Sequence, residues 1–220
     1  MPHFSPAFLN FFKALAANNS TAWFDENRKT YEKEVKKPFA EFVEDMIYRI
    51  QQHEPEVRIK ASDAIMRINK DIRFSKDKTP YHTYVAAIIS KTGKKDKSYP
   101  GLYFQLSPEG LSIYGGAYMI ENDKLEKLRS HIATHLKEFS ALYSDKGFKE
   151  KFGTIQGEQH KRIPPAFQEA HTKEPLIANK QFYFSAELKP TIIVSEELPE
   201  KIMEYYLVGK KINDFLKAAW

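Results

Sequence analysis

The sequence predicts a single α+β domain in which an antiparallel sheet is packed by helices from both ends of the chain. Apolar side chains recur at helical spacing in residues 1–55, and the pattern changes to a period of two in residues 60–118. The helical period returns in residues 122–220, around one further run typical of a strand. Because short turns separate the successive strand-like runs, we expect an antiparallel meander of about four to five strands. No repeat or linker divides residues 1–220.

The amino-terminal segment, residues 1–55, predicts three helices. The first follows the capping residue Ser5. The second starts at Ser20 or Thr21 and places the guanidinium of Arg28 among aromatic side chains on one face. Pro38 starts the third, whose apolar stripe is typical of a core helix and consists of Phe39, Phe42, Val43, Met46, Ile47 and Ile50.

The middle of the chain predicts three strands, over residues 81–90, 101–106 and 111–118. A tight turn joins the last two. The lysine-rich segment Lys91–Lys97 is expected to form a flexible hairpin loop. The pair Gly115-Gly116 suggests a bulge or a close approach of another backbone.

The carboxy-terminal part predicts helices around one more strand. We expect a helix from Asn122 to Phe139, a short helix over residues 143–152, a strand over residues 181–188 and a final amphipathic helix over residues 198–216. Gly209 lies in the final helix, where it allows a neighbouring element to come close.

The composition restricts the possible chemistry. The chain carries 34 Lys and Arg against 29 Asp and Glu, a net charge of +5, which permits an anionic partner without requiring nucleic acid. It has no Cys, which excludes disulfides and a cysteine nucleophile. No stretch is apolar enough for a membrane span and the amino terminus does not look like a signal peptide, so we expect a cytoplasmic protein.

Motifs of several common enzyme classes do not occur in the chain. There is no Gly-rich phosphate loop, no Gly-x-Ser-x-Gly and no His-Glu-x-x-His. His131 and His135 are one helical turn apart with Glu138 nearby, but they flank an apolar stripe and match no recognised metal motif. We therefore expect neither a metal nor a cofactor, and the residues indicate no particular reaction.

The stretch Arg67–Tyr81 carries the most regular pattern. Read with period two, it places Met66, Ile68, Ile72 and Phe74 on one side of an extended chain and Arg67, Asn69, Asp71 and Arg73 on the other. This predicts a strand with one packed face and one ionic face. Two guanidiniums beside one carboxylate leave net positive charge, so the ionic face can accept an anion.

From this pattern we predict a basic pocket for a small anionic ligand, phosphorylated ligands included. The candidate ligand-binding residues are Arg67, Lys70, Asp71, Arg73, Lys78, Tyr81, Arg28 and Lys180. Arg67 and Arg73 would clamp the anion, Asp71 would orient them, and Lys78 and Tyr81 would close the rim. If chemistry occurs there, Asp71 or His82 would carry the proton.

Two other interpretations remain open. In the first, a non-enzymatic interaction module binds nucleic acid or an acidic protein through Lys94, Lys95 and Lys97, with stacking on Tyr81, Tyr84, Tyr99 and Tyr103. In the second, the ionic residues form only a salt-bridge network that holds the hairpin in register. The sequence predicts no oligomeric state.

The same stretch resembles the signature of a bacterial family, the domain of unknown function numbered 2461. That signature is Arg-x-x-Arg-Asp-x-Arg-Phe-x-x-Asp/Asn-Lys-x-x-Tyr, and the matching positions are Arg67, Asp71, Arg73, Phe74, Asp77, Lys78 and Tyr81. Lys70 stands where the family has its second arginine, which keeps the charge but loses a bidentate contact. The resemblance implies no function.

The resemblance extends along nearly the whole chain. The other positions that look like the family pattern are Asn19, Trp23, Phe24, Asn27, Arg28, Tyr31, Gly115, Gly116, Arg162, Pro164, Lys180, Phe182 and Tyr183. Pro165 and Ala166 depart from it, because they stand where the family is expected to have arginine and glycine.

Overall fold

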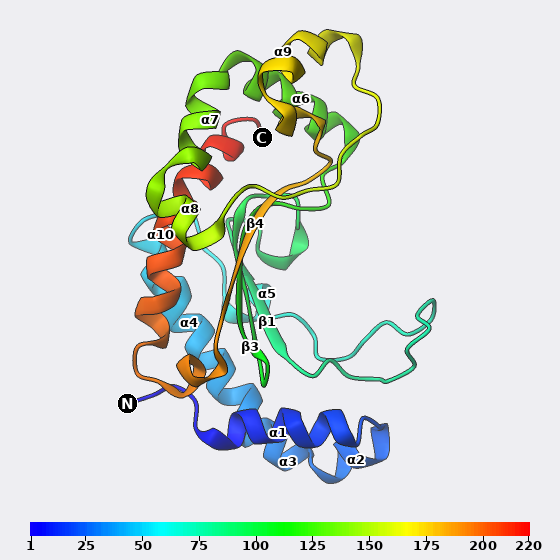
Figure 1. Cartoon of the computed structure of the whole chain (residues 1–220). Helices are drawn as coiled ribbons and strands as arrows, with labels where there is room; N and C mark the ends of the chain where they lie inside the picture. Colours follow the sequence, from blue (N-terminus) through cyan, green and yellow to red (C-terminus); the bar gives the residue numbers. More distant parts are fainter.

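Four strands form one antiparallel sheet at the centre of the molecule (Figure 1). They are β1 (Val85–Ile89), β2 (Gly101–Ser107), β3 (Gly110–Ala117) and β4 (Phe182–Leu188), in the order β1-β2-β3-β4. Tyr103 pairs with Tyr114, and Tyr114 pairs with Ser185. The computed structural model describes all 220 residues. It confirms the predicted α+β class and the antiparallel sheet.

Residues 6–64 form five helices, α1 (Pro6–Ala17), α2 (Thr21–Glu26), α3 (Arg28–Tyr31), α4 (Lys37–Gln51) and α5 (Ala61–Ala64). The Ser20 hydroxyl accepts a hydrogen bond from the Trp23 amide, which caps α2. The second predicted helix is interrupted at Asn27, and a π-helical turn over Glu32–Lys36 leads into α4. Arg28 is exposed, and its guanidinium lies over the Phe24 ring, 5.6 Å from the ring centroid, as the predicted aromatic face requires.

The carboxy-terminal helices are α6 (Asn122–Thr134), α7 (Leu136–Ser144), α8 (Lys146–Phe152), α9 (Gln168–Lys173) and α10 (Leu198–Lys217). The single helix predicted from Asn122 to Phe139 is two helices. It breaks at His135, whose φ of −123° lies outside the helical region and whose Nδ1 lies 2.8 Å from the His131 carbonyl oxygen.

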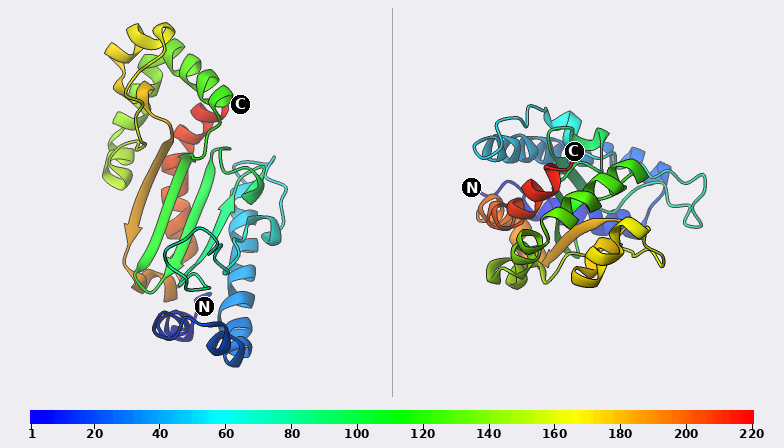
Figure 2. Two further views of the ribbon diagram at one scale, coloured as in Figure 1. Left: turned by 90° about the vertical axis from the view of Figure 1, so that its right-hand side faces the viewer. Right: turned by 90° about the horizontal axis from the view of Figure 1, so that it is seen from above.

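One face of the sheet is covered by α4 and α10, which lie behind it in the left view of Figure 2. Two apolar clusters form the core, and both include strand residues on this face. The larger includes Phe8, Phe42 and Phe104, and the smaller includes Phe139 and Phe182. The strand residues that point to this face are therefore aliphatic or aromatic, as the period of two predicts.

Phe184 of β4 occupies space left by two glycines. A Cβ at Gly115 would come within 2.4 Å of the Phe184 ring, and a Cβ at Gly209 would come within 2.5 Å. Gly116 has a φ of +96°, which favours glycine. The sequence suggested either a bulge or a close approach at Gly115 and Gly116. The pairing of β2 with β3 continues through both glycines without a bulge, so the structure shows the close approach.

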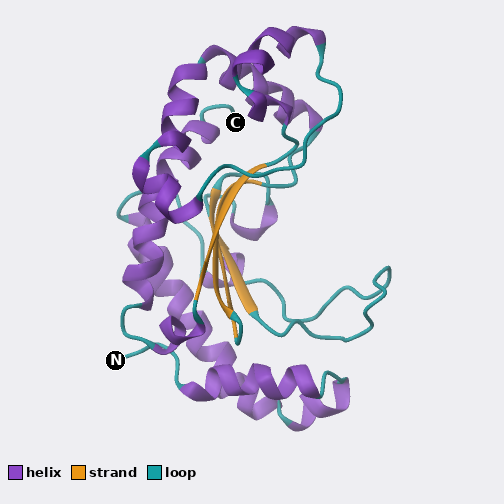
Figure 3. Ribbon diagram, in the orientation of Figure 1, coloured by secondary structure: helices purple, strands orange, loops and turns teal.

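The long helices leave the opposite face of the sheet open (Figure 3). At one end of the sheet, a helical lobe formed by residues 122–180 overhangs this side. At the other end, residues 67–80 project from the body as an extended excursion, which we call the arm (Figure 1). None of the helices combines the length and the apolar composition needed to cross a bilayer.

The arm is not the strand that the period of two predicts. The isolated bridge Asn69 with Tyr81 is its only strand-like pairing, and a second isolated bridge, Ile65 with Ala87, lies just before it on the body. Phe74 is 94% exposed, whereas the prediction placed it on the packed face. The alternation ends because the Asp71 carboxylate accepts a hydrogen bond from the Arg73 amide at 3.3 Å, which turns the chain before Phe74.

Candidate functional site

The charged side chains of the arm mostly pair with one another. The Arg73 guanidinium donates to the two Asp71 oxygens at 3.0 and 2.7 Å, and Lys70 donates to Asp77 at 2.8 Å. Bonding to Arg73 holds the pKa of Asp71 below its usual range, and bonding to Lys70 does the same for Asp77. Arg67 is exposed and has no ion-pair or hydrogen-bond partner. The arm therefore contains a salt-bridge network and one free guanidinium.

The amino-terminal helices anchor the root of the arm. Tyr81 is 5% exposed, and its ring stacks on Phe24 with the centroids 4.0 Å apart. The Asn19 side-chain amide donates to the Tyr81 carbonyl at 2.9 Å and accepts from the Tyr81 amide at 3.1 Å. Asn19 thus supplies partners for the backbone amide and carbonyl of Tyr81, as a neighbouring strand would. Two segments that resemble the family pattern meet at this contact.

The open face of the sheet carries a cleft of about 490 Å³. Its lining comes from all four strands, from the root of the arm and from the loop between β1 and β2. This lining includes His82 and Lys97, no carboxylate, and six tyrosines, namely Tyr84, Tyr99, Tyr103, Tyr114, Tyr118 and Tyr183. The volume falls within the range of about 300–1,000 Å³ that is usual for small-molecule sites.

Three of these tyrosines form a floor across neighbouring strands, Tyr103 on β2, Tyr114 on β3 and Tyr183 on β4. The ring centroids of Tyr103 and Tyr114 are 5.5 Å apart, and those of Tyr114 and Tyr183 are 6.4 Å apart. The Tyr103 hydroxyl donates to Gln105 at 2.9 Å. Burial raises the pKa of Tyr103 and Tyr114, so both hydroxyls stay protonated at neutral pH. The floor therefore offers aromatic surface together with hydrogen-bond donors.

His82 lies at the end of the cleft that adjoins the arm. Burial lowers the pKa of its imidazole, and the charges of Lys70 and Arg67 lower it further. The imidazole is therefore neutral at pH 7. Because both cations act on His82, they lie within electrostatic reach of this end of the cleft, and the exposed Lys97 adds a third cation to the lining. An anionic group placed beside His82 would meet a positive potential.

The structure does not bring the eight predicted ligand-binding residues into one pocket, and none of them lines the cleft. Arg28 pairs with Asp25, and Lys180 pairs with Glu158 in the lobe. Lys78 donates to the Ile72 carbonyl within the arm. Tyr81 does not close a rim, because Phe24 covers its ring. Of the two proposed proton carriers, His82 lines the cleft, and Asp71 is held by Arg73.

The lysine-rich loop also differs from its prediction. Residues 93–95 form a 3₁₀ turn, and Lys94 donates to the carbonyls of Ser62 and Ile65 at 2.6 and 2.9 Å. The loop is therefore tied to α5 and does not form a free hairpin. His131 and His135 of the lobe pack against Phe215 of α10, with the ring centroids of His131 and Phe215 4.5 Å apart.

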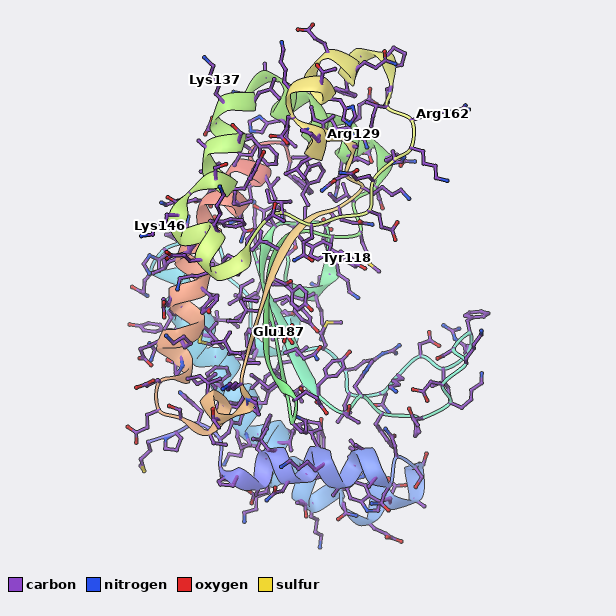
Figure 4. The ribbon with its side chains drawn as sticks, viewed as in Figure 1. Tyr118, Arg129, Lys137, Lys146, Arg162 and Glu187 are labelled. Atoms are coloured by element: carbon purple, nitrogen blue, oxygen red, sulfur yellow. The ribbon has the colours of Figure 1, made fainter.

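Sequence reasoning missed most of the floor. The sequence suggests Tyr84, Tyr99 and Tyr103 as stacking residues, but it does not point to Tyr114, Tyr118 or Tyr183 as residues of a site. The signal that could have found them is the alternation within β3 and β4, where aromatic or polar residues alternate with core residues. Applied to all strands at once, the same period places Tyr103, Tyr114 and Tyr183 on one face. Figure 4 shows Tyr118 at the upper end of this face.

Comparison with known proteins identifies one family. Residues 7–215 match the family described as Conserved hypothetical protein (DUF2461). No curated protein and no solved structure matches the chain. The matched range takes in the helices that anchor the arm, the arm itself, all four strands and most of α10. The chain therefore belongs to the DUF2461 family of conserved hypothetical proteins.

Proposed function

We propose that this protein binds a small organic anion in the cleft on the open face of its sheet. The flat part of the ligand rests on the tyrosine floor, and its anionic group lies beside His82 and Arg67. The observation that carries the proposal is the lining itself, which has six tyrosines and no carboxylate. Arg67, whose guanidinium has no partner, directly follows the lining residue Met66 in the sequence. The proposed ligand is an anion, as the sequence predicts, but its site is the cleft on the sheet and not the ionic face of residues 67–73.

The aromatic floor supports a ligand that contains a planar ring. Stacking on an aromatic side chain contributes roughly 1–3 kcal/mol per ring, and tyrosine hydroxyls can also bond to polar groups at the ring edge. Gln105 adds an amide whose position is fixed by the Tyr103 hydroxyl. An aliphatic anion would leave most of this surface uncovered.

The charges near the cleft support an anionic group at the arm end. Arg67 can form a bidentate hydrogen bond with a phosphate or carboxylate, because no side chain of the protein occupies its donors. Lys70 is committed to Asp77, and it contributes through its charge. The neutral imidazole of His82 can accept a hydrogen bond from the ligand, and it is the one group in the cleft that is suited to exchange a proton near neutral pH.

Titration calorimetry with three probes tests the proposal. Adenosine 5′-monophosphate carries both the ring and the anion, adenosine carries the ring, and inorganic phosphate carries the anion. We expect the monophosphate to bind more tightly than either part. Arg67→Met should weaken the monophosphate by about 1–2 kcal/mol and leave adenosine unchanged. Tyr114→Leu should weaken both by about 1–2 kcal/mol.

Arg58→Met is the matched control, because Arg58 is exposed and bonds only to the Pro55 carbonyl. It should leave binding of all three probes unchanged. Absence of monophosphate binding at millimolar concentration, or equal losses in the Arg58 and Arg67 variants, would contradict the proposed site.

A further inference from the structure

Basic side chains continue beyond the cleft along the arm. Residues 67–78 contain five cations, Arg67, Lys70, Arg73, Lys76 and Lys78, against the two acids Asp71 and Asp77. The arm therefore carries a net charge of +3, more than half of the net charge of the chain, which is +5. It projects on the side of the sheet that bears the tyrosine floor. A positive surface thus extends the positive end of the cleft.

The turn of the arm presents a fully exposed aromatic ring. Phe74 is 94% exposed, and the Arg73 guanidinium lies 5.8 Å from the centre of its ring. Arg73 is fixed by the two hydrogen bonds to Asp71, so the ring and the guanidinium are held together at the surface. No other Phe, Leu, Ile or Val approaches this exposure. An exposed aromatic ring among cations is a surface on which a base of a polyanion can stack.

A second basic segment lies on the lobe, at the other end of the open face. Lys161 and Arg162 are exposed and have no partner in the chain, and His160 precedes them. In Figure 4, Arg162 extends from the loop of the lobe toward the side on which the arm projects. The tyrosine floor therefore lies between two basic segments that face the same way.

The length of the sheet, along which the arm and the lobe lie at opposite ends, fits several nucleotides. At about 3.4 Å per residue, the seven residues of β2 span roughly 24 Å. Proteins that bind single strands without base readout combine a basic path with aromatic stacking, and their sites begin at about four nucleotides. An acidic protein would match the charges but would leave the aromatic floor without a partner.

We propose that the cleft is the centre of a binding surface for single-stranded nucleic acid. Bases stack on Tyr103, Tyr114 and Phe74, and the phosphates follow the arm and the Lys161–Arg162 segment. This inference rests on the proposed function, because it places bases on the same tyrosine floor. The sequence predicted a nucleic-acid contact through Lys94, but the ammonium group of Lys94 donates hydrogen bonds to two backbone carbonyls. The proposed surface therefore uses other cations.

Fluorescence anisotropy with a labelled single-stranded octanucleotide of thymidine tests the inference. The wild type should bind it more tightly than the monophosphate, and the affinity should fall with salt. Lys161→Gln/Arg162→Gln should reduce the slope of log K against log salt by about 1.4, which corresponds to two lost phosphate contacts. Phe74→Ala should weaken binding about tenfold and leave the salt slope unchanged.

Lys137→Gln/Lys146→Gln is the matched control. It removes the same charge from α7 and α8, on the side of the lobe away from the arm (Figure 4), and it should change neither affinity nor slope. None of these variants touches the cleft, so adenosine 5′-monophosphate should bind all of them as it binds the wild type. Equal effects of the two double variants on the octanucleotide would show nonspecific attraction and overturn the inference.

Competition experiments separate this inference from the proposed function. Equal binding of a DNA duplex or of polyglutamate would overturn the single-strand inference. Monophosphate binding without tighter octanucleotide binding would overturn it as well, and the small-anion proposal would stand. Octanucleotide binding that requires Tyr114, together with no monophosphate binding, would contradict the small-anion proposal alone.

Discussion

Asn19→Ala tests how the amino-terminal helices hold the arm against the sheet. The side chain of Asn19 makes two hydrogen bonds to the backbone of Tyr81, at 2.9 and 3.1 Å, across 62 positions of sequence. Alanine removes both partners, and Phe24 restricts the access of water to Tyr81 from the ring side. At about 1–2 kcal/mol for each unsatisfied backbone group, the variant should lose about 2–4 kcal/mol of unfolding free energy.

Urea unfolding followed by circular dichroism measures this loss. The midpoint should fall while the slope stays constant, because the change affects the folded contacts and not the surface exposed on unfolding. For a chain of this length, the loss corresponds to a decrease in melting temperature of roughly 5–15 °C. Hydrogen exchange should accelerate at the amides of Lys70 and His82, whose bonds to the Pro80 and Ile68 carbonyls close the base of the arm.

Asn18→Ala is the matched control for this prediction. Asn18 is exposed and donates only to the Ala14 carbonyl at the end of α1, so its loss should cost about 1 kcal/mol at most. If the two variants unfold at the same urea concentration, Asn19 does not hold the arm, and the structural link between the two family segments is wrong.

Three further predictions concern stability. Lys217→Met should lose about 3–5 kcal/mol of unfolding free energy in urea, because the carboxylate of Glu54, which is 4% exposed, then keeps only its bond to Tyr206. The double variant Glu54→Gln/Lys217→Met should recover most of this loss, and no recovery would refute the ion pair between Lys217 and Glu54. Gly209→Ala should lose about 1–3 kcal/mol, because the new methyl group meets the Phe184 ring, and an unchanged midpoint would contradict this close approach. Burial lowers the pKa of His82, His131 and His160, so the unfolded chain binds more protons and stability should decline as the pH falls from about 7 to 5. His82→Gln should flatten this decline, and a rise in stability over this range would contradict it.

The regular elements could be predicted because local periodicity determines them. Buried and less buried residues alternate from Gly101 to Leu106 in β2 and from Leu111 to Ala117 in β3, and the apolar stripe of α4 lies under the sheet as expected. The break at His135 was missed because it depends on side-chain bonds to the helix backbone that no apolar pattern records. The π-helical turn before α4 was missed for a similar reason, since its apolar side chain Val35 is buried as in an ordinary helix.

The candidate site was predicted only in part, because it depends on contacts between distant segments. The charge pattern of Arg67 to Arg73 was visible, but the turn at Asp71 that exposes Phe74 is a local bond that overrides the period of two. The burial of Tyr81 depends on Phe24, which lies 57 positions earlier. The floor needs the register of β3 with β4, and residues 118–181 separate these two strands in the sequence.

NMR spectra of the protein with isotope-labelled tyrosine rings test most directly whether the floor binds a ligand. On titration with adenosine 5′-monophosphate, the ring signals of Tyr103, Tyr114 and Tyr183 should shift together and saturate. The signals of Tyr48, which is exposed on α4, and of Tyr143, which bonds to Glu174 in the lobe, should remain in place. Floor signals that stay unchanged, or shifts confined to Tyr48 and Tyr143, would contradict a ligand site on the open face of the sheet.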